Sequence, residues 1–347
     1  MGISTCHKTL KQTKEMSSSV VYQGEKYYTD KENVKEMLDR YGVAIVPNVL
    51  GADLCDDYYG EMWSSLEHMT SGWSVPIDRN DEGTYREYYK LFPKHGMLIQ
   101  NFKVGHAQYV WDIRQNTEIV DVFSKGIWGC NNEDLLVSFD GVSFGLPPEI
   151  TNRGWERGND WLHTDQSYTR NEFECIQSFV TLRDVEEGDG TFRFMEGSHL
   201  FHKEFADEFE MKDKSDWYKI NMEEHYNFYK ERGCEEYRIK CPKGSLVLWD
   251  SRVIHSGALP LKSRKNKNIR SIVYVCYMPR FLIDGKAMKR TLSKRIKAFE
   301  EMRLTSHWPT KCKLFPVYPR TYGQKIEEIQ DIESPVLNDL GYKLVGY

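Results

Sequence analysis

The sequence predicts a mainly β fold with flanking helices, in which short strands form a sandwich or a jelly roll. From residue 135 onward, runs rich in β-branched and aromatic residues alternate with turn residues such as Asp189-Gly190. Short strands at this spacing are typical of all-β sandwiches and jelly rolls. On both sides of this region, apolar residues recur at three- and four-residue steps, as in helices that pack on a sheet. The expected strands are 135–139, 177–182, 191–195, 237–240, 245–249 and 270–277.

The N-terminal third is expected to be helical, with one buried strand. Thr29 and the acidic residues after it can begin a helix that Gly42 ends. The β-branched run 43–46 then predicts a strand, which Pro47 closes. Further helices are expected at 52–69, 104–114 and 118–128, and the residues 71–95 have the composition of a loop.

The rest of the chain adds an insert and a basic end to the predicted core. An acidic helical insert is expected at 203–236, a basic helix at 286–303 and a proline-rich loop at 307–322. We therefore expect a mobile N-terminal tail (1–20) and one domain (21–347). That domain comprises a helical part with one strand (21–134), a jelly-roll core (135–280), and a basic helix and loop (281–347).

The composition excludes several classes of protein. Of the 347 residues, 40% are hydrophobic and 13% aromatic, enough for a sizeable core, so most of the chain is not disordered. The longest apolar run has about eight residues, whereas a bilayer-spanning helix needs ~20, so no membrane span is expected. The eight cysteines form no CxxC pair, which argues against a thiolate zinc site. With no secretory or peroxisomal signal, we expect a cytoplasmic protein with reduced cysteines.

The net charge of −5 hides a strong asymmetry along the chain. Between Cys241 and Arg320, 18 lysines and arginines oppose four acids, a net +14, so the remainder carries −19. One explanation is the solvent-exposed face of the basic helix, whose apolar residues pack on the sheet. The other is an electropositive rim for an anionic substrate such as a CoA thioester, a phosphorylated metabolite or a nucleic acid.

One cluster combines metal-binding side chains with a plausible scaffold. Residues i and i+2 of a strand share a face, so His163 and Asp165 would point the same way, and His255 could join them from a neighbouring strand. Two imidazoles and a carboxylate form the facial triad of non-haem Fe(II) oxygenases. Alone, a His-x-Asp tripeptide is weak evidence, because a hydrogen-bonded strand histidine is the commoner explanation.

The context of these residues resembles the phytanoyl-CoA dioxygenase (PhyH) branch of the Fe(II)/2-oxoglutarate oxygenases. Four blocks are similar to that family in the same order: HTDQSY at 163–168, VTLRDV through FMEGSH at 180–199, PKGSLVLWDSRVIHSG at 242–257, and RSIVY at 270–274. The opening strand, GVAIVPNVL at 42–50, is similar as well. The sequence departs from the family pattern at Glu196, where proline is usual, and in the order Ser256-Gly257.

The resemblance implies a double-stranded β-helix, a cupin-like jelly roll, in which His163, Asp165 and His255 bind Fe(II). The 2-oxoglutarate co-substrate would pair with Arg270, which opens a strand, although Arg264 in the preceding loop is a rival because the spacing is longer than usual. Phe179 and Thr181 would face the co-substrate side, but core packing alone would also explain Phe179. Tyr168 would contact co-substrate or substrate, and His199 would orient a turn.

The implied reaction uses O2 and 2-oxoglutarate to hydroxylate a C–H bond, with release of succinate and CO2. Asp165 favours hydroxylation over halogenation, since related halogenases leave that position open for chloride. Two alternatives stay open: a catalytically inactive PhyH-like binding protein, and a cupin-type zinc, nickel or manganese enzyme that uses no 2-oxoglutarate. The partner is a small-molecule or anionic substrate, with nucleic acid as a further possibility, and the sequence indicates neither its identity nor the oligomeric state.

Overall fold

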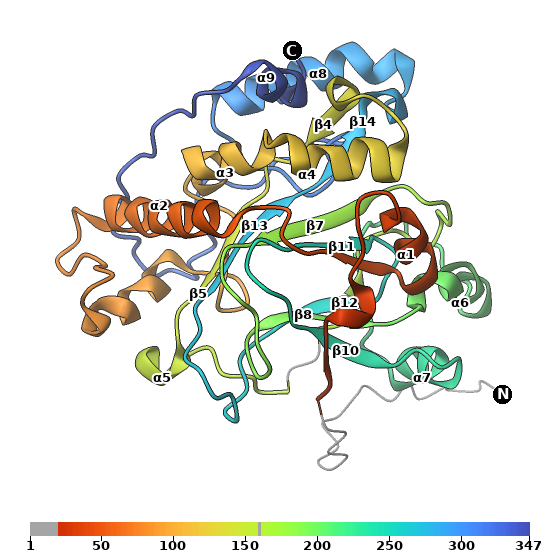
Figure 1. The fold of residues 1–347 in the computed structure, drawn as a ribbon, viewed down its shortest axis with the longest axis horizontal. Helices are drawn as coiled ribbons and strands as arrows, with labels where there is room; N and C mark the ends of the chain where they lie inside the picture. The colour runs from red at the N-terminus through yellow and green to blue at the C-terminus, as the bar shows by residue number, and fades with distance from the viewer. Residues whose placement is uncertain (1–19, 159–160) are drawn as a thin grey trace.

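Two six-stranded sheets form the centre of the molecule in a computed structural model that describes residues 20–158 and 161–347 (Figure 1). The first consists, in spatial order, of β2 (Val43–Val46), β11 (Leu246–Asp250), β7 (Ile176–Thr181), β13 (Arg270–Val275), β5 (Val142–Gly145) and β3 (Leu98–Ile99). The second consists of β1 (Tyr22–Gln23), β10 (Glu236–Ile239), β8 (Thr191–Met195), β12 (His255–Ala258), β6 (His163–Thr164) and β9 (Tyr218–Lys219).

The strand pairing is that of an antiparallel jelly roll, as the sequence predicts. Among the strands named above, only β1 and β10 pair in parallel. Side chains from the inner faces of the two sheets meet in one apolar cluster, where Trp249 of the first sheet packs on its neighbour Phe179 and on Phe192 of the second sheet. A separate two-stranded ladder joins β4 (Leu135–Val137) to β14 (Tyr277–Pro279), so the predicted strand 270–277 is divided at Cys276.

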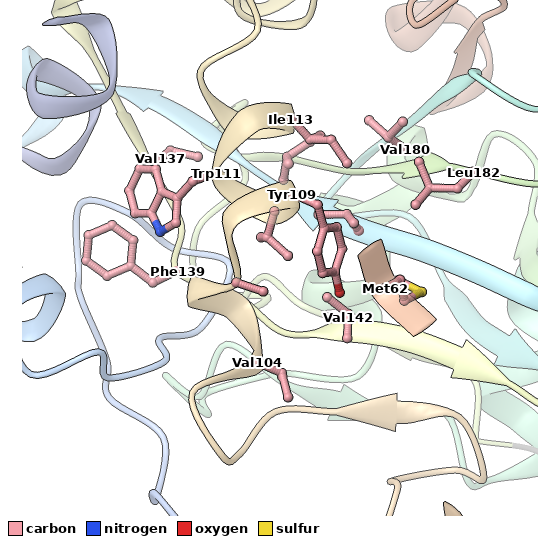
Figure 2. Close-up of a cluster of buried hydrophobic side chains, with 14 of the residues drawn as sticks. Met62, Val104, Tyr109, Trp111, Ile113, Val137, Phe139, Val142, Val180 and Leu182 are labelled. Atoms are coloured by element: carbon pink, nitrogen blue, oxygen red, sulfur yellow. The ribbon is translucent and has the colours of Figure 1, made fainter. Parts of the chain in front are cut away.

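Helices cover the outer face of the first sheet (Figure 1). They are α2 (Ala52–Thr70), α3 (Gln108–Arg114), α4 (Thr117–Asp121), α8 (Gly285–Glu300) and α9 (Asp339–Val345). Tyr109 and Ile113 of α3 lie with Met62 of α2 over Val142 and Val180 of the sheet (Figure 2). Burying a large apolar side chain contributes roughly 1.5–3 kcal/mol to stability, so these helices are firmly packed on the outer face of the sheet. The inner face is therefore the one left for a site.

The turn from α1 (Val34–Tyr41) into β2 requires glycine. Gly42 has φ +77°, and a Cβ there would lie 2.5 Å from Cγ2 of Val253 and 2.6 Å from Nδ1 of His199. Both neighbours belong to the segments that lead into and support β12, so this turn is packed directly behind the strand that carries His255.

The acidic insert contains a strand as well as the expected helices. Between α6 (His202–Glu208) and α7 (Glu223–Glu231), β9 pairs with β6 and places Lys219 opposite His163. The insert therefore extends the second sheet beside the predicted metal ligand. Its own aromatic cluster includes Phe205 and Tyr229.

Several predicted boundaries differ from the structure. The loop 71–95 contains a 3-10 helix (Glu82–Leu91), the helix 104–114 begins as a separate 3-10 turn (Val104–His106), and the helix 118–128 becomes a π-helix at Val122–Trp128. The remaining short elements, none of them predicted, are 3-10 turns at Glu25–Tyr27, Asn132–Asp134, Ser198–Phe201 and Arg280–Leu282, and the helix α5 (Pro148–Thr151).

Across the described residues, no helix is long and apolar enough to cross a membrane. The expected tail lies outside the described residues apart from Val20, and the single domain and the cytoplasmic location stay predictions.

Candidate active site

The three predicted metal ligands meet at the junction of β6 and β12. His163 and His255 are directly paired across these strands, and Asp165 follows β6 by one residue. Nε2 of His163 lies 3.7 Å, and Nε2 of His255 3.5 Å, from Oδ2 of Asp165. All three side chains are buried, and their ligand atoms lie within 4.8 Å of one another. Strand pairing thus brings together residues that are ninety positions apart.

Both histidines are held in the tautomer that a metal requires. Nδ1 of His163 lies 2.9 Å from the carbonyl oxygen of Trp161, and Nδ1 of His255 lies 2.9 Å from that of Val253. A carbonyl oxygen only accepts, so each Nδ1 carries a proton, and in the neutral imidazole the Nε2 lone pair is then free to bind a metal. This is the usual outer contact of metal-binding histidines.

The carboxylate of Asp165 is also fixed by neighbouring groups. Its backbone N–H donates to the carbonyl oxygen of Ser251 (3.0 Å), and Nε2 of Gln177 donates to its Oδ2 (3.0 Å). Gln177 lies on β7 in the opposite sheet and is buried. The position of Asp165 therefore depends on both sheets.

The electrostatics of the site favour an ionised Asp165 and a neutral His255. Burial alone would raise the pKa of Asp165, but the nearby His163 and His307 and the close approach of His255 hold it well below its usual value. Burial lowers the pKa of His255, and the neighbouring His163 lowers it further. A neutral imidazole and a carboxylate are the forms that bind metal ions.

A cavity of about 620 Å³ opens directly on these three residues. Its volume lies within the range of small-molecule sites, roughly 300–1,000 Å³. Of the residues predicted to contact co-substrate, Arg270 and Phe179 line it. The guanidinium carbon of Arg270 lies 5.5 Å from the centre of the Phe179 ring, so the two residues form one wall.

The structure distinguishes Arg270 from its rival Arg264. All three guanidinium nitrogens of Arg264 have carboxylate partners: Nε and Nη2 contact Glu149 at 2.6–2.7 Å, and Nη1 contacts Asp189 at 3.2 Å. Its side chain is only 1% exposed. In Arg270, Nη1 donates to the carbonyl oxygen of Gly190 (2.9 Å), whereas the buried Nε has no partner among the described residues. Arg270 thus has spare donors at the cavity, and Arg264 has none to offer.

The other predicted contacts lie outside the cavity lining. Thr181 Oγ1 donates to the carbonyl oxygen of Arg183 (2.6 Å), and Tyr168 places its hydroxyl 2.8 Å from that of Tyr229. Tyr168 also stacks on His202 (ring centres 4.3 Å apart), within the core of the insert. Neither side chain lines the cavity. Thr181 is held by its hydrogen bond at the end of β7, and Tyr168 is held by its contacts with the insert.

His199 makes the structural contact that the sequence suggested. Its Nε2 lies 3.0 Å from the carbonyl oxygen of Asp39, beside the Gly42 turn.

Several cavity residues do not follow from the sequence motifs. Gln177 is one that period-two alternation could have indicated, since it precedes Phe179 by two residues on the same strand. His95 and Trp217 come from segments without a periodic pattern, and His307 lies in the proline-rich loop. No local signal marks these positions.

The basic segment reaches the cavity only in part. Arg270, Lys311 and Lys313 line it, but no residue of α8 does. The helix α8 lies beside α9, away from β12, the strand that carries His255 (Figure 1).

Comparisons with known proteins agree with this geometry. The model of the phytanoyl-CoA dioxygenase (PhyH) family matches residues 38–268, which include the two histidines and the aspartate. The chain belongs to this family. A relative, the Ava biosynthesis cluster protein O of Aspergillus versicolor, is 26% identical over 81% of this chain and 88% of its own length.

A solved structure shares the fold of this PhyH-family protein. A hypothetical protein, JW0805, from Escherichia coli aligns with 92% of this chain and 85% of its own, at 13% identity and a TM-score of 0.56. The epimerase SnoN, solved in complex with Fe3+, alpha ketoglutarate and nogalamycin RO, aligns with 72% of this chain and 84% of its own at 16% identity and a TM-score of 0.45.

Proposed function

We propose that this protein is an Fe(II)- and 2-oxoglutarate-dependent dioxygenase that hydroxylates a C–H bond of a small substrate. The observation that carries the proposal is the buried set of His163, Asp165 and His255 at the wall of a cavity that also presents Arg270. Membership of the PhyH family supports the same chemistry.

The residues fit an Fe(II) ion by the chemistry of their donors. Two neutral imidazoles and one carboxylate on a single face are the usual ligands of non-haem Fe(II) and leave the opposite positions open. When bound, the metal and 2-oxoglutarate would activate O2 for attack on a C–H bond. The protein's part is to hold the three ligands in position, through Trp161, Val253 and Gln177.

Arg270 would anchor the co-substrate. A guanidinium matches a carboxylate with two parallel hydrogen bonds, and the buried Nε of Arg270 has no other partner among the described residues. Phe179 would limit the space beside it and hold the guanidinium plane.

Hydroxylation is favoured over halogenation because Asp165 occupies the third ligand position. Its carboxylate is held by Gln177 and lies within ligand distance of both histidines, so the protein supplies three ligands rather than two.

Formation of succinate from 2-oxoglutarate tests the proposal. The assay uses iron-loaded protein with fractionated small molecules, acyl-CoAs, peptides and nucleic acids as substrates. Succinate should require iron and O2 and should be lost in His163→Ala and Asp165→Ala. An Arg290→Leu variant, altered on the exposed face of α8, should keep full activity.

Metal analysis tests the alternative of a cupin-type enzyme that uses no 2-oxoglutarate. Two histidines and a carboxylate also bind zinc in hydrolytic enzymes. Anaerobically purified protein that contains zinc, nickel or manganese and turns over without 2-oxoglutarate would establish the cupin-type enzyme. Absence of any 2-oxoglutarate turnover with the whole substrate panel would favour the inactive binding protein.

A further inference from the structure

The cavity beside the metal ligands has more cationic than anionic side chains. Five cations line it, Lys94, Lys214, Lys311, Lys313 and Arg270, together with the carboxylates of Asp140, Asp165 and Asp216. In the proposed function Arg270 and Asp165 are committed to co-substrate and metal. Four lysines and two aspartates then remain for whatever else the cavity binds.

The remaining carboxylates neutralise few of these lysines. Asp216 pairs with Lys311 (2.6 Å) but is shared with Arg170, which does not line the cavity. Oδ1 of Asp140 accepts hydrogen bonds from the backbone N–H of Gly141 (2.7 Å) and from Nε2 of Gln100 (3.0 Å).

The other three lysines are free to meet an anion. Nζ of Lys94 donates to Oε1 of Gln100 (2.9 Å) and lies 5.1 Å from the ring centre of Phe315, and it forms no ion pair with a described residue. The exposed Lys214 and Lys313 form none with described residues either. A cavity with unpaired cations and low-dielectric walls concentrates anionic ligands.

Aromatic rings line the same cavity as these lysines and the predicted metal ligands. His95 and Trp161 stack face to face, with ring centres 3.8 Å apart and planes 6° apart, and Trp161 stacks in turn on His163 at 4.8 Å. Trp217 lies 5.9 Å from His163, lines the cavity and is 50% exposed, so part of its indole is accessible to a ligand. This exposed ring can stack on a planar ligand group.

We propose that the substrate is a small anion with a planar, aromatic or conjugated, body. The proposal rests on the proposed function, since it assigns the part of the cavity that metal and co-substrate leave free. Lys94, Lys313 and Lys214 would bind its carboxylate or phosphate, and the exposed ring of Trp217 would stack on its body. Nucleic acid is disfavoured, because the basic face of α8 does not line the cavity.

Three matched probes test this by calorimetry with iron-loaded full-length protein and 2-oxoglutarate under anaerobic conditions. They are 2-naphthoate (planar, anionic), 2-naphthamide (planar, neutral) and decahydro-2-naphthoate (anionic, not planar). 2-Naphthoate should bind about tenfold more tightly than either other probe at low salt. Its advantage over the amide should shrink in ~1 M salt, where the Debye length is about 3 Å.

Single substitutions test which residues contact the charge and the ring of the probes. Lys94→Gln and Lys313→Gln should each weaken 2-naphthoate about three- to tenfold and leave 2-naphthamide unchanged. Trp217→Leu should weaken both planar probes but not the decahydro acid. Lys289→Gln, on the exposed face of α8, is the matched control and should change nothing.

Three results would overturn the proposal: equal affinity for 2-naphthoate and 2-naphthamide, no measurable binding of 2-naphthoate at millimolar concentration, or an equal effect of Lys289→Gln and Lys94→Gln. An oligonucleotide that competes with 2-naphthoate and depends on Lys289 would also overturn it, in favour of nucleic acid. If the proposed function itself is wrong, 2-oxoglutarate will not bind the iron-loaded protein. That result distinguishes its failure from a failure of the substrate proposal alone.

Discussion

The metal centre should depend on Gln177, a residue of the opposite sheet that touches no metal. Its side-chain amide donates to Oδ2 of Asp165 at 3.0 Å, and it is buried. In Gln177→Leu the volume is nearly kept and this hydrogen bond is lost. The carboxylate can then rotate away from the two histidines, whose Nε2 atoms lie 3.5–3.7 Å from it.

The expected loss of metal affinity is 10- to 100-fold. Outer-shell partners of metal ligands typically contribute about this factor, which corresponds to roughly 1.4–2.8 kcal/mol. The same range follows from the hydrogen bond itself, because a bond to a charged group contributes about 1.5–3 kcal/mol. Titration of Co(II) into the metal-free protein, in competition with a chelator, measures the affinity directly.

Ser178→Ala is the matched control on the same strand. Ser178 is also buried and donates to the carbonyl oxygen of Val275 at 2.6 Å, but it does not line the cavity. This variant should lose about 0.5–1.5 kcal/mol of unfolding free energy and keep its Co(II) affinity. The reasoning is refuted if Gln177→Leu binds Co(II) as tightly as the wild type, or if Ser178→Ala loses equally.

Three further predictions concern stability, measured by chemical denaturation of the metal-free protein. Arg295→Met should lower the unfolding free energy by about 2–5 kcal/mol, because this fully buried guanidinium donates to four backbone carbonyls that would lose their partner. Gly42→Ala should cost about 1–3 kcal/mol, since the turn has φ +77° and no room for a Cβ, whereas Gly51→Ala, in open space, should cost under about 1 kcal/mol. At neutral pH, Asp216→Asn should be less stable than the wild type by about 1 kcal/mol. Burial alone would raise the pKa of Asp216, but hydrogen bonds from Lys311 and Arg170 hold it below its usual value.

The sign of the Asp216 prediction follows from its lowered pKa. The carboxylate contributes stability above its unfolded pKa of about 3.9, and this contribution is lost as the pH falls through the folded value. The difference between wild type and Asp216→Asn should therefore begin to shrink below about pH 4 and disappear only below the lowered folded pKa. A difference that persists unchanged to pH 2 would contradict this account.

The regular strands and the cluster of His163, Asp165 and His255 could be predicted from the sequence because their signals are local or belong to a motif. The strands β2 and β8 lie where their β-branched and aromatic residues indicate. His163 and Asp165 are two residues apart, a spacing that places both side chains on one face of an extended segment. The third ligand, His255, needed the family resemblance, since only strand pairing brings it to His163.

The cavity could not be predicted in the same way. Trp217 and Lys94 belong to irregular segments whose position depends on long-range packing, and Lys311 lies in a proline-rich loop. Tyr168 was expected at the co-substrate because it follows the ligand motif closely. The insert instead provides a partner for its hydroxyl in Tyr229. Short strands such as β6 and β9 have two residues each, too few for a periodic pattern.

The central claim is that His163, Asp165 and His255 hold one Fe(II) to which 2-oxoglutarate binds with the help of Arg270. Anaerobic titration of the metal-free protein with Fe(II) and 2-oxoglutarate, followed by the visible charge-transfer absorption of the chelated co-substrate, tests it directly. The account predicts a band that saturates at one iron per chain and is absent in His255→Ala. In Arg270→Leu, saturation should require about 10- to 100-fold more 2-oxoglutarate. Absence of the band in the wild type, or its persistence in His255→Ala, would contradict the account.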